Sequence, residues 1–471
     1  MRKAMRPLME TKSFLASLLA MSLLLLASCD RSPKAGTLVL TQVKRSAGET
    51  NVLDQVFDGR GVSSRIVALD PGKAEEGVSE LSSGFFAAMS PEISYDGRFL
   101  LFAGKRLESD PWRIWEMDLA DRSLAAISPE DAICLDPAYL PGDQVVYSRY
   151  VPEDITPGHY ALERCRRNGE ERQRITFSPD DYRASTVLHD GRILVLNRQV
   201  YPQAQEAVWK VLRPDGTKEE LFYASEYGEL LPYRARETAD GKIFFLERDR
   251  ESQSLGLASV SYNLPHSGSE RDPYDLEGDL LTIFGTDTGE LLVAYRDASA
   301  DRIGLSVWDP EKAGMERDVL KDPDYDILQA SVITSRQRPK KLPSEVDPAE
   351  ATALLMCQDV NLSSAETMEA VQLEVIGVAG SLGVIGLEND GSVYLRIKAD
   401  TPFQLQALDA EGKVVKGPSS WITMRPNERR GCVGCHAGHD RVPENRQPLS
   451  VQKEPVVIPR VIENNLAKNS K

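Results

Sequence analysis

The chain has 471 residues, of which 41% are hydrophobic and 27% charged, so a collagen-like, coiled-coil or wholly disordered protein is excluded. The formal net charge of −16 at pH 7 argues against a nucleic-acid partner, because binding to a phosphate backbone needs a basic stripe and the sequence has none. With 33 glycines and 28 prolines against 12 phenylalanines, the chain is rich in turns, which favours an all-β fold.

Residues 1–28 have the pattern of a bacterial signal peptide. A basic segment precedes a short apolar run from Phe14 to Ala27, too short to span a membrane as a free helix. The run ends Leu-Ala-Ser-Cys at Cys29, which resembles a lipobox, in which the cysteine is lipidated and becomes the first mature residue. We therefore expect an extracytoplasmic protein, anchored by a lipid on Cys29 to a bacterial membrane and facing the periplasm or the cell surface. An ordinary signal peptide that happens to end in a cysteine is the alternative.

A repeat of 45–50 residues fills the region 36–337. Each copy has a glycine turn followed by an apolar run, which predicts a tight hairpin turn and a buried strand. A second turn-like patch follows in each full copy, and two hairpins per repeat are typical of a four-stranded propeller blade. The glycines that start the apolar runs are Gly36, Gly97, Gly142, Gly191, Gly241 and Gly289.

The two ends of this region each supply part of a blade. The copy at Gly36 lacks the strand that precedes the turn in the other copies, and Asp326–Gln337 contains a lone strand signal. Pairing these two strands would close a six-bladed β-propeller and remove its open sheet edges. A parallel β/α arrangement is the alternative, but helical periodicity is missing between the strands. The repeat from Ser90 to Arg98 resembles that of Tol-type periplasmic propellers, a likeness that implies no activity.

Three segments follow the propeller. Residues 338–346 are basic and flanked by prolines, which predicts an extended linker. Residues 347–441 alternate short apolar runs with turns and predict a small β-sandwich-like domain. The apolar segment Leu373–Gly386 contains four glycines, which fits a strand and turn better than a membrane span. Residues 442–471 are polar and contain prolines, so we expect a strap or a poorly ordered tail.

The second domain ends in a Cys-x-x-Cys-His motif, which is the attachment motif of a c-type haem. Two thiols three positions apart can add to the two vinyl groups of one porphyrin, and the next histidine can bind the iron. The sequence therefore predicts one covalent haem c, held by Cys432 and Cys435, with His436 as the proximal ligand. The signal peptide supports this prediction, because bacteria attach haem covalently outside the cytoplasm.

Other uses of the motif remain open. A zinc site would draw its four ligands from only eight residues, whereas zinc fingers close a longer loop between ligand pairs. A redox or structural disulfide within the motif is also possible. The zinc ligands would be Cys432, Cys435, His436 and His439.

The sixth iron ligand has several candidates. Met424 could supply a thioether from the preceding strand, whereas His439 is so close to the proximal ligand in sequence that it fits a secondary role better. His159, His189 and His266 could reach across from the propeller, although a lone histidine is more often a surface or packing residue. An open sixth position would instead imply ligand binding or catalysis.

Three cysteines remain besides Cys29 and the two of the motif. Because their number is odd, at least one stays unbridged, and Cys134 could pair with Cys165 in an oxidising compartment. The alternative is that Cys134, Cys165 and Cys357 all pack as small apolar residues.

The segment 391–441 resembles the middle domain of the hydrazine synthase alpha subunit, notably at Gly391-Ser-Val-Tyr-Leu, at Ser420-Trp-Ile-Thr-Met-Arg-Pro426 and at the Cys-x-x-Cys-His motif. That family places a six-bladed propeller before a small domain with one c-type haem, so the resemblance implies this architecture and cofactor for most of residues 36–440. In the family, a tyrosine just past the motif binds the iron and the motif histidine binds zinc. Here Asp440 lies four residues beyond His436, and the sequence contains no tyrosine after Tyr394. The iron and zinc ligation of the family is therefore not carried over to this chain. Because a second Cys-x-x-Cys-His is missing, we also expect the family's C-terminal haem domain to be absent.

Three functions are consistent with this sequence. The first interpretation is a lipid-anchored monohaem cytochrome c that exchanges electrons with a redox protein docked on the propeller or at the haem edge. The second is a haem enzyme, a component of an oxidoreductase, whose iron faces a pocket between the domains and acts on a small nitrogen or oxygen species. The third is a propeller scaffold without a cofactor. The oligomeric state is not fixed by the sequence.

Overall fold

The computed structural model describes residues 33–44, 63–226, 228–253, 255–263, 265, 270–271, 278–285, 291–297, 302–309, 314–362, 369–434 and 445–459. Their regular structure is strand apart from two short 3₁₀ helices, η1 (Pro71–Glu76) and η2 (Leu449–Gln452), which confirms the all-β prediction. Within these ranges, every helix is too short or too polar to cross a membrane. The predicted signal peptide and Cys29 lie outside the described residues.

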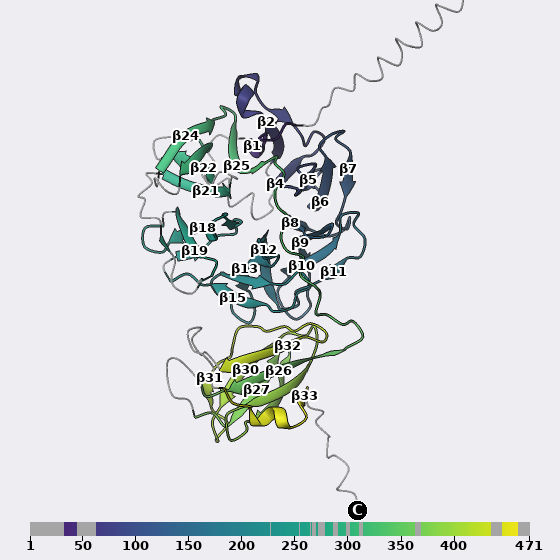
Figure 1. The fold of residues 1–471 in the computed structure, drawn as a ribbon, viewed down its shortest axis with the longest axis vertical. Coiled ribbons are helices and arrows are strands. Elements are labelled where there is room, and N and C mark those ends of the chain that lie inside the picture. The colour runs from purple at the N-terminus through teal and green to yellow at the C-terminus, as the bar shows by residue number, and fades with distance from the viewer. Residues whose placement is uncertain are drawn as a thin grey trace, which may run out of the picture.

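Residues 38–332 form six sheets among the described residues, arranged around a common centre (Figure 1). The first three sheets are β25 (Tyr325–Val332), β1 (Leu38–Lys44), β2 (Ser64–Leu69) and β3 (Ser79–Glu80); β4 (Ala87–Ile93), β5 (Phe99–Lys105), β6 (Arg113–Asp118) and β7 (Leu124–Ala126); and β8 (Cys134–Leu140), β9 (Gln144–Val151), β10 (His159–Arg166) and β11 (Gln173–Arg174). The other three are β12 (Asp180–Val187), β13 (Ile193–Gln199), β14 (Val208–Leu212) and β15 (Glu220–Tyr223); β16 (Gly228–Leu230), β17 (Arg236–Glu237), β18 (Lys242–Asp249), β19 (Leu255–Ser261) and β20 (Glu270–Arg271); and β21 (Gly278–Gly285), β22 (Leu291–Asp297), β23 (Gly304–Asp309) and β24 (Gly314–Leu320).

The glycine turns lie where the repeat predicts them, between the first and second strands of a sheet. The four described turn glycines that follow a first strand in sequence have φ values of 73–89°, the left-handed region that glycine adopts without strain. The apolar run after each turn is the second strand, which pairs antiparallel with the first. These glycines are Gly97, Gly142, Gly191 and Gly241.

The last strand of the propeller pairs with the first strand of the chain. β25 runs antiparallel to β1, from Leu38 opposite Val332 to Lys44 opposite Tyr325. The lone strand signal therefore completes the N-terminal sheet, as the pairing hypothesis required. Aromatic side chains fill the space between neighbouring sheets. The Phe245 ring, for example, lies 5.0 Å from that of Tyr223, centroid to centroid.

The second domain consists of two four-stranded sheets around one core. The sheets are β32 (Arg429–Gly434), β26 (Thr352–Asp359), β29 (Val393–Lys398) and β33 (Val456–Ile458); and β28 (Gly380–Gly386), β27 (Gln372–Gly377), β30 (Phe403–Leu408) and β31 (Val414–Lys416). Leu355 and Leu395 of one sheet pack in the same cluster as Val375 and Phe403 of the other. This arrangement is the predicted sandwich, and Leu373–Gly386 is a strand–turn–strand unit within it.

The C-terminal segment is more ordered than the sequence predicts. Residues 445–459 contain η2 and β33, and β33 runs parallel to β29 at the sheet edge. The Arg446 guanidinium donates to the Asp390 carboxylate and, at 3.0 Å, to the Gln358 carbonyl. The expectation of a poorly ordered tail from residue 442 is therefore wrong for these residues, which form the strap that was the other possibility.

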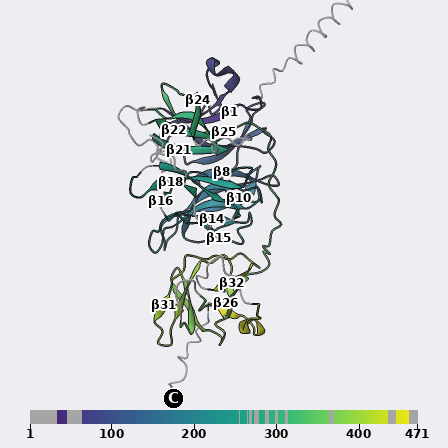
Figure 2. The same cartoon turned by 60° about the vertical axis from the view of Figure 1, so that its left-hand side comes forward.

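The segment 333–347 connects the two domains without forming a helix or strand. It lies against the propeller, because Arg336 N donates to the Tyr95 carbonyl at 2.9 Å and Lys340 N donates to the His189 carbonyl at 3.3 Å. Glu345 N then donates to Asp215 Oδ2 at 2.7 Å. Figure 2 shows this segment descending along the propeller to the second domain. The linker is extended and also docked.

Candidate functional site

The first cysteine of the motif lies on β32, an edge strand of the second domain. β32 runs parallel to β26, and the register places Cys432 opposite Cys357. Cys432 is partly buried and packs against the core of the domain, and this burial raises the pKa of its thiol. At Gly434 a side chain would meet the Leu362 carbonyl at 2.5 Å, so only glycine fits there. The strand is thus held tightly up to the residue before Cys435.

Cys435, His436 and His439 lie outside the described residues, so the haem ligation stays a prediction. The described part of the motif suits the group, because Cys432 is a partly buried thiol at the end of an edge strand, where a thioether could form. Within the described ranges, His, Cys, Asp and Glu side chains nowhere gather in a group of three or more that could hold a metal ion.

The other described ligand candidates have the contacts of packing residues. Met424 lies in a loop and not on a strand as predicted, and its side chain is buried in the core of the second domain. His159 is buried, with Nε2 3.3 Å from an Arg174 nitrogen, and burial lowers its pKa. His189 is exposed and lies beside Glu237, whereas His266 is outside the described residues.

Cys134 and Cys165 are buried free thiols in β8 and β10 of the same sheet, with β9 between their strands. Burial raises the pKa of each thiol to about 12. The structure therefore favours the packing role over the disulfide for this pair.

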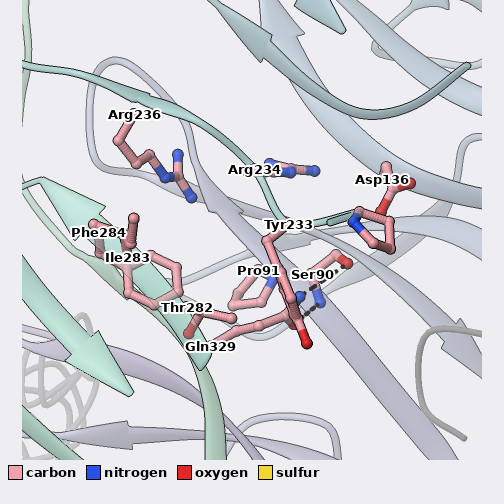
Figure 3. Close-up of a pocket in the computed structure, with 11 residues that line it drawn as sticks. Ser90, Pro91, Asp136, Tyr233, Arg234, Arg236, Thr282, Ile283, Phe284 and Gln329 are labelled. Atoms are coloured by element: carbon pink, nitrogen blue, oxygen red, sulfur yellow. Dashed lines mark hydrogen bonds between the residues drawn. The ribbon is translucent and has the colours of Figure 1, made fainter. Parts of the chain in front are cut away.

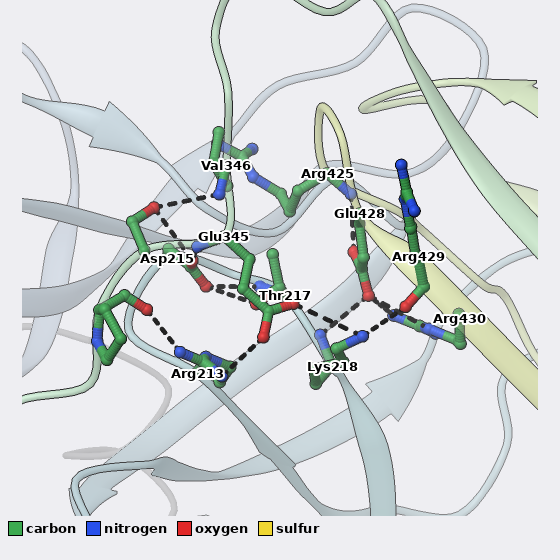
Figure 4. Close-up of polar contacts among 12 residues, drawn as sticks. Arg213, Asp215, Thr217, Lys218, Glu345, Val346, Arg425, Glu428, Arg429 and Arg430 are labelled. Carbon is green, nitrogen blue, oxygen red and sulfur yellow. Dashed lines mark hydrogen bonds and ion pairs between the residues drawn. The ribbon is translucent and has the colours of Figure 1, made fainter.

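A buried carboxylate, Glu428, joins the propeller to the segment that leads into β32 (Figure 4). Glu428 is 0% exposed. Its Oε1 accepts from the backbone N–H of Lys218 at 2.9 Å and from the Arg430 guanidinium at 2.8 Å. Its Oε2 accepts from the Arg425 N–H at 2.8 Å. Because Lys218 belongs to the propeller, this network fixes β32 relative to the fourth sheet.

Further contacts strengthen this junction. The Trp421 indole donates to the Tyr201 carbonyl at 2.6 Å, and the two rings stack at 6.3 Å between centroids. Arg213 of the propeller donates to Glu345 of the linker at 2.8 Å. The second domain is therefore also attached to the propeller through Trp421, and the linker through Glu345.

A pocket of about 270 Å³ lies between the fourth sheet and the second domain. The second domain contributes residues 420–423 and Arg430, which is two positions before Cys432. The propeller contributes side chains of β12–β15, including Asp180 and Lys210. The pocket thus joins the strand that carries the motif to a polar wall of the propeller.

That wall contains a buried lysine between two carboxylates. Lys210 Nζ lies 2.8 Å from Glu219 Oε1 and 3.6 Å from Asp180 Oδ2. Burial raises the pKa of Asp180, and its Oδ1 is buried without a hydrogen-bond partner within the described residues. Although burial alone would lower the pKa of Lys210, the two carboxylates raise it. A carboxyl group that binds a proton more readily than usual can exchange protons with a bound molecule.

The sequence pattern does not predict this cluster. Asp180, Lys210 and Glu219 lie on or beside three strands of one sheet, and only the blade topology brings them together. The one available signal was the position of Lys210 within an otherwise apolar run, Val208–Leu212.

Comparisons with known proteins agree with this architecture. Residues 345–437 match the family described as the hydrazine synthase alpha subunit middle domain. The hydrazine synthase subunit alpha of Kuenenia stuttgartiensis is 39% identical over 62 residues, which are 12% of this chain and only 8% of that protein. The solved hydrazine synthase of Kuenenia stuttgartiensis superimposes on 89% of this chain and 72% of that chain, with a TM-score of 0.76 and 18% identity.

TolB from Acinetobacter baumannii aligns more loosely, with a TM-score of 0.46 and 12% identity over 70% of this chain and 74% of that one. At 18% identity the structural match to hydrazine synthase shows the fold alone, whereas the family match covers residues 345–437. Together they confirm that the chain resembles the hydrazine synthase alpha subunit, in the fold of its propeller and in the sequence of its second domain.

Proposed function

We propose that this protein is an extracytoplasmic haem c enzyme of the hydrazine synthase alpha type, anchored to a membrane by a lipid on Cys29, which acts on a small nitrogen species. The observation that carries the proposal is the pocket between the domains. Arg430 lines it two residues before Cys432, and Asp180 and Lys210 line it from the propeller. The sequence match of residues 345–437 supports both the cofactor and the class of substrate.

The propeller is proposed to be a closed ring of six blades. The pairing of β25 with β1 supports closure, because it joins the last strand of the propeller to the first sheet. In such a ring the fourth sheet is a rigid wall, and Glu428 fixes the second domain to it.

When bound, haem c supplies a redox-active iron, with Cys432 and Cys435 as its covalent attachments and His436 as the proximal ligand. The residues of the chain perform the other tasks. Asp180 Oδ1 holds or releases a proton at the pocket wall, and Lys210 forms an ion pair with Glu219 beside it. Arg430, held by Glu428, keeps β32 in place and presents a positive charge to the pocket. Electrons are exchanged with a redox protein partner.

We infer an enzyme and not a cytochrome that only transfers electrons. A cytochrome that only transfers electrons needs an exposed haem edge and two axial ligands, and does not need a pocket with a buried proton-holding carboxyl. His159 and Met424 are buried, and His189 lies exposed beside Glu237, which supports an open sixth position.

The first experiment measures covalent haem and its open coordination site. The full chain is produced with a bacterial haem c maturation system and examined by pyridine haemochrome spectroscopy after denaturation. We expect a c-type α-band in the wild type and its loss in Cys435→Ala. Cys357→Ala is the matched control, because Cys357 neighbours Cys432 but is not part of the motif, so the band should persist.

Carbon monoxide then distinguishes the functions. We expect the reduced wild type to bind carbon monoxide as isolated, which requires an exchangeable iron site. A covalent haem that ignores carbon monoxide would contradict the enzyme and favour the electron-transfer cytochrome. Absence of covalent haem would contradict both and leave the scaffold.

A further inference from the structure

The centre of the propeller contains more positive than negative charge. Four guanidinium groups surround two carboxylates, which come from β4 and β8. Three of the arginines belong to the propeller and one comes from the linker. These residues are Arg183, Arg234, Arg236 and Arg336, with Glu92 and Asp136.

Both carboxylates already accept hydrogen bonds from arginines. Glu92 accepts from Arg336 and, at 3.1 Å, from Arg234, and it lies 3.7 Å from Arg236. Burial alone would raise the pKa of Glu92, but these arginines lower it to about 2. Asp136 Oδ2 accepts from Arg183 at 2.7 Å, and its pKa is also lowered. Each carboxylate is therefore ionised at pH 7. Because the Arg336 side chain is 37% exposed to solvent, one positive charge among the three less exposed arginines remains uncompensated within the set.

Two N–H donor groups of these arginines have no hydrogen-bond partner among the described residues. They are Nε of Arg236 and Nη2 of Arg183, and both are buried. Burial lowers the pKa of Arg236 to about 10, so its side chain is still charged at pH 7. A buried cation with an unused donor is costly unless an acceptor reaches it.

Two small cavities lie beside this excess charge. One, of about 20 Å³, is lined by Arg234, Arg236, Ser90 and Gln329 and also by the arginine-paired Asp136 (Figure 3). The other, of about 30 Å³, is lined by Arg234, Arg236 and Arg336 and also by the arginine-paired Glu92. A cavity of roughly 10–15 Å³ holds one water molecule, so each has room for one or two such positions. A nucleotide or sugar is too large, whereas a compact anion of three or four heavy atoms fits.

We propose that the centre of the propeller binds a small oxyanion, either inorganic or a free carboxylate, between the Arg234 and Arg236 side chains. The planar guanidinium groups favour an oxyanion over a halide, because two N–H donors match two oxygens. The anion would neutralise part of the excess charge and accept the unused Arg236 donor. This site is independent of the haem, since its residues belong to the propeller and the linker.

The test is isothermal titration calorimetry of the full chain, with nitrate and formate as separate probes in a buffer free of other small anions. We expect saturable binding of at least one probe, and the stronger of the two identifies the inorganic or the carboxylate class. Arg236→Gln should weaken binding by at least about tenfold. The matched control is Arg248→Gln on β18, whose arginine pairs with Glu229 near the surface and should leave binding unchanged.

Arg236→Lys is a second variant in case Arg236→Gln does not fold, because it keeps the positive charge and removes the planar guanidinium group. A folded Arg236→Lys with weakened binding supports the site. Wild-type protein that binds neither probe overturns the proposal. Equal binding by the wild type and both Arg236 variants also overturns it, because the anion then binds elsewhere.

Discussion

Glu92 couples the stability of the propeller to pH. Its carboxylate is surrounded by Arg234, Arg236 and Arg336, which lower its pKa in the folded protein from 4.5 to about 2. A depressed pKa means that the stabilisation is complete above pH 4.5 and is lost as the pH falls towards 2. The expected size of this contribution is about 3 kcal/mol.

We predict that Glu92→Gln removes this part of the acid dependence. The difference in unfolding free energy between the wild type and the variant should shrink as the pH falls from 4.5 to 2, because the wild type loses its ionised carboxylate there. Urea unfolding at several pH values measures the difference. The exposed Glu108→Gln serves as the control and should parallel the wild type. A constant difference for Glu92→Gln would contradict the prediction.

For single residues, the sequence predicts the haem attachment motif but neither the cluster around Lys210 nor the central arginines, and the difference has a physical reason. The Cys-x-x-Cys-His motif is recognisable because covalent attachment requires residues at fixed neighbouring positions. Asp180, Lys210 and Glu219 have no such constraint, since each comes from a different part of one sheet. The central arginines are equally hidden, because Arg183, Arg234 and Arg336 are far apart in the chain.

At the scale of elements, the linker packs against the turn at Gly191, which lies between the first and second strands of its sheet, but not against the equivalent turn at Gly241. At Gly191 a side chain would meet the Lys340 carbonyl at 1.9 Å, and the glycine has φ +89°. Gly241 has nearly the same conformation, with φ +81°, but a side chain there would meet nothing within 4 Å. The two positions separate backbone strain from the contact with the linker.

We predict that Gly191→Ala destabilises the protein more than Gly241→Ala. The left-handed conformation alone should cost about 1–2 kcal/mol in each variant. Gly191→Ala should cost at least about 2 kcal/mol more, because the linker must move away from the turn. Urea unfolding of both variants checks this, and equal losses would mean that the linker is not docked at this turn.

The strands predicted best are those with a local signal. The apolar runs after the glycine turns identify β5, β9, β13 and β18, because turn and strand are adjacent in sequence. β33 has no such signal: its three residues are held by β29, which lies far away in the chain. For this reason the sequence alone does not distinguish a strap from a poorly ordered tail in this segment.

On the scale of the whole molecule, Glu428 is the link that makes two domains behave as one. It is buried and accepts from the propeller at Lys218 and from its own domain at Arg425 and Arg430. Removing the carboxylate leaves these donors unpaired and the Arg430 charge uncompensated.

We predict that Glu428→Ala uncouples the domains. The loss should be about 3–5 kcal/mol, the usual cost of removing one partner from a buried ionic network. Calorimetry should show one transition for the wild type and two for the variant. Glu411→Ala, at an exposed turn of the same domain, should keep the single transition. A single transition for Glu428→Ala would mean that Trp421 and the linker suffice.

The position of β1 determines how the molecule would stand on a membrane. β1 belongs to the first sheet, whereas the second domain is fixed to the fourth, on the opposite side of the ring (Figure 1). A lipid on Cys29 would tether the chain next to β1, and the propeller would then act as a spacer. The pocket beside Arg430 would lie on the far side of the ring from the tether. Access to the pocket would thus be from the aqueous compartment and not from the lipid surface.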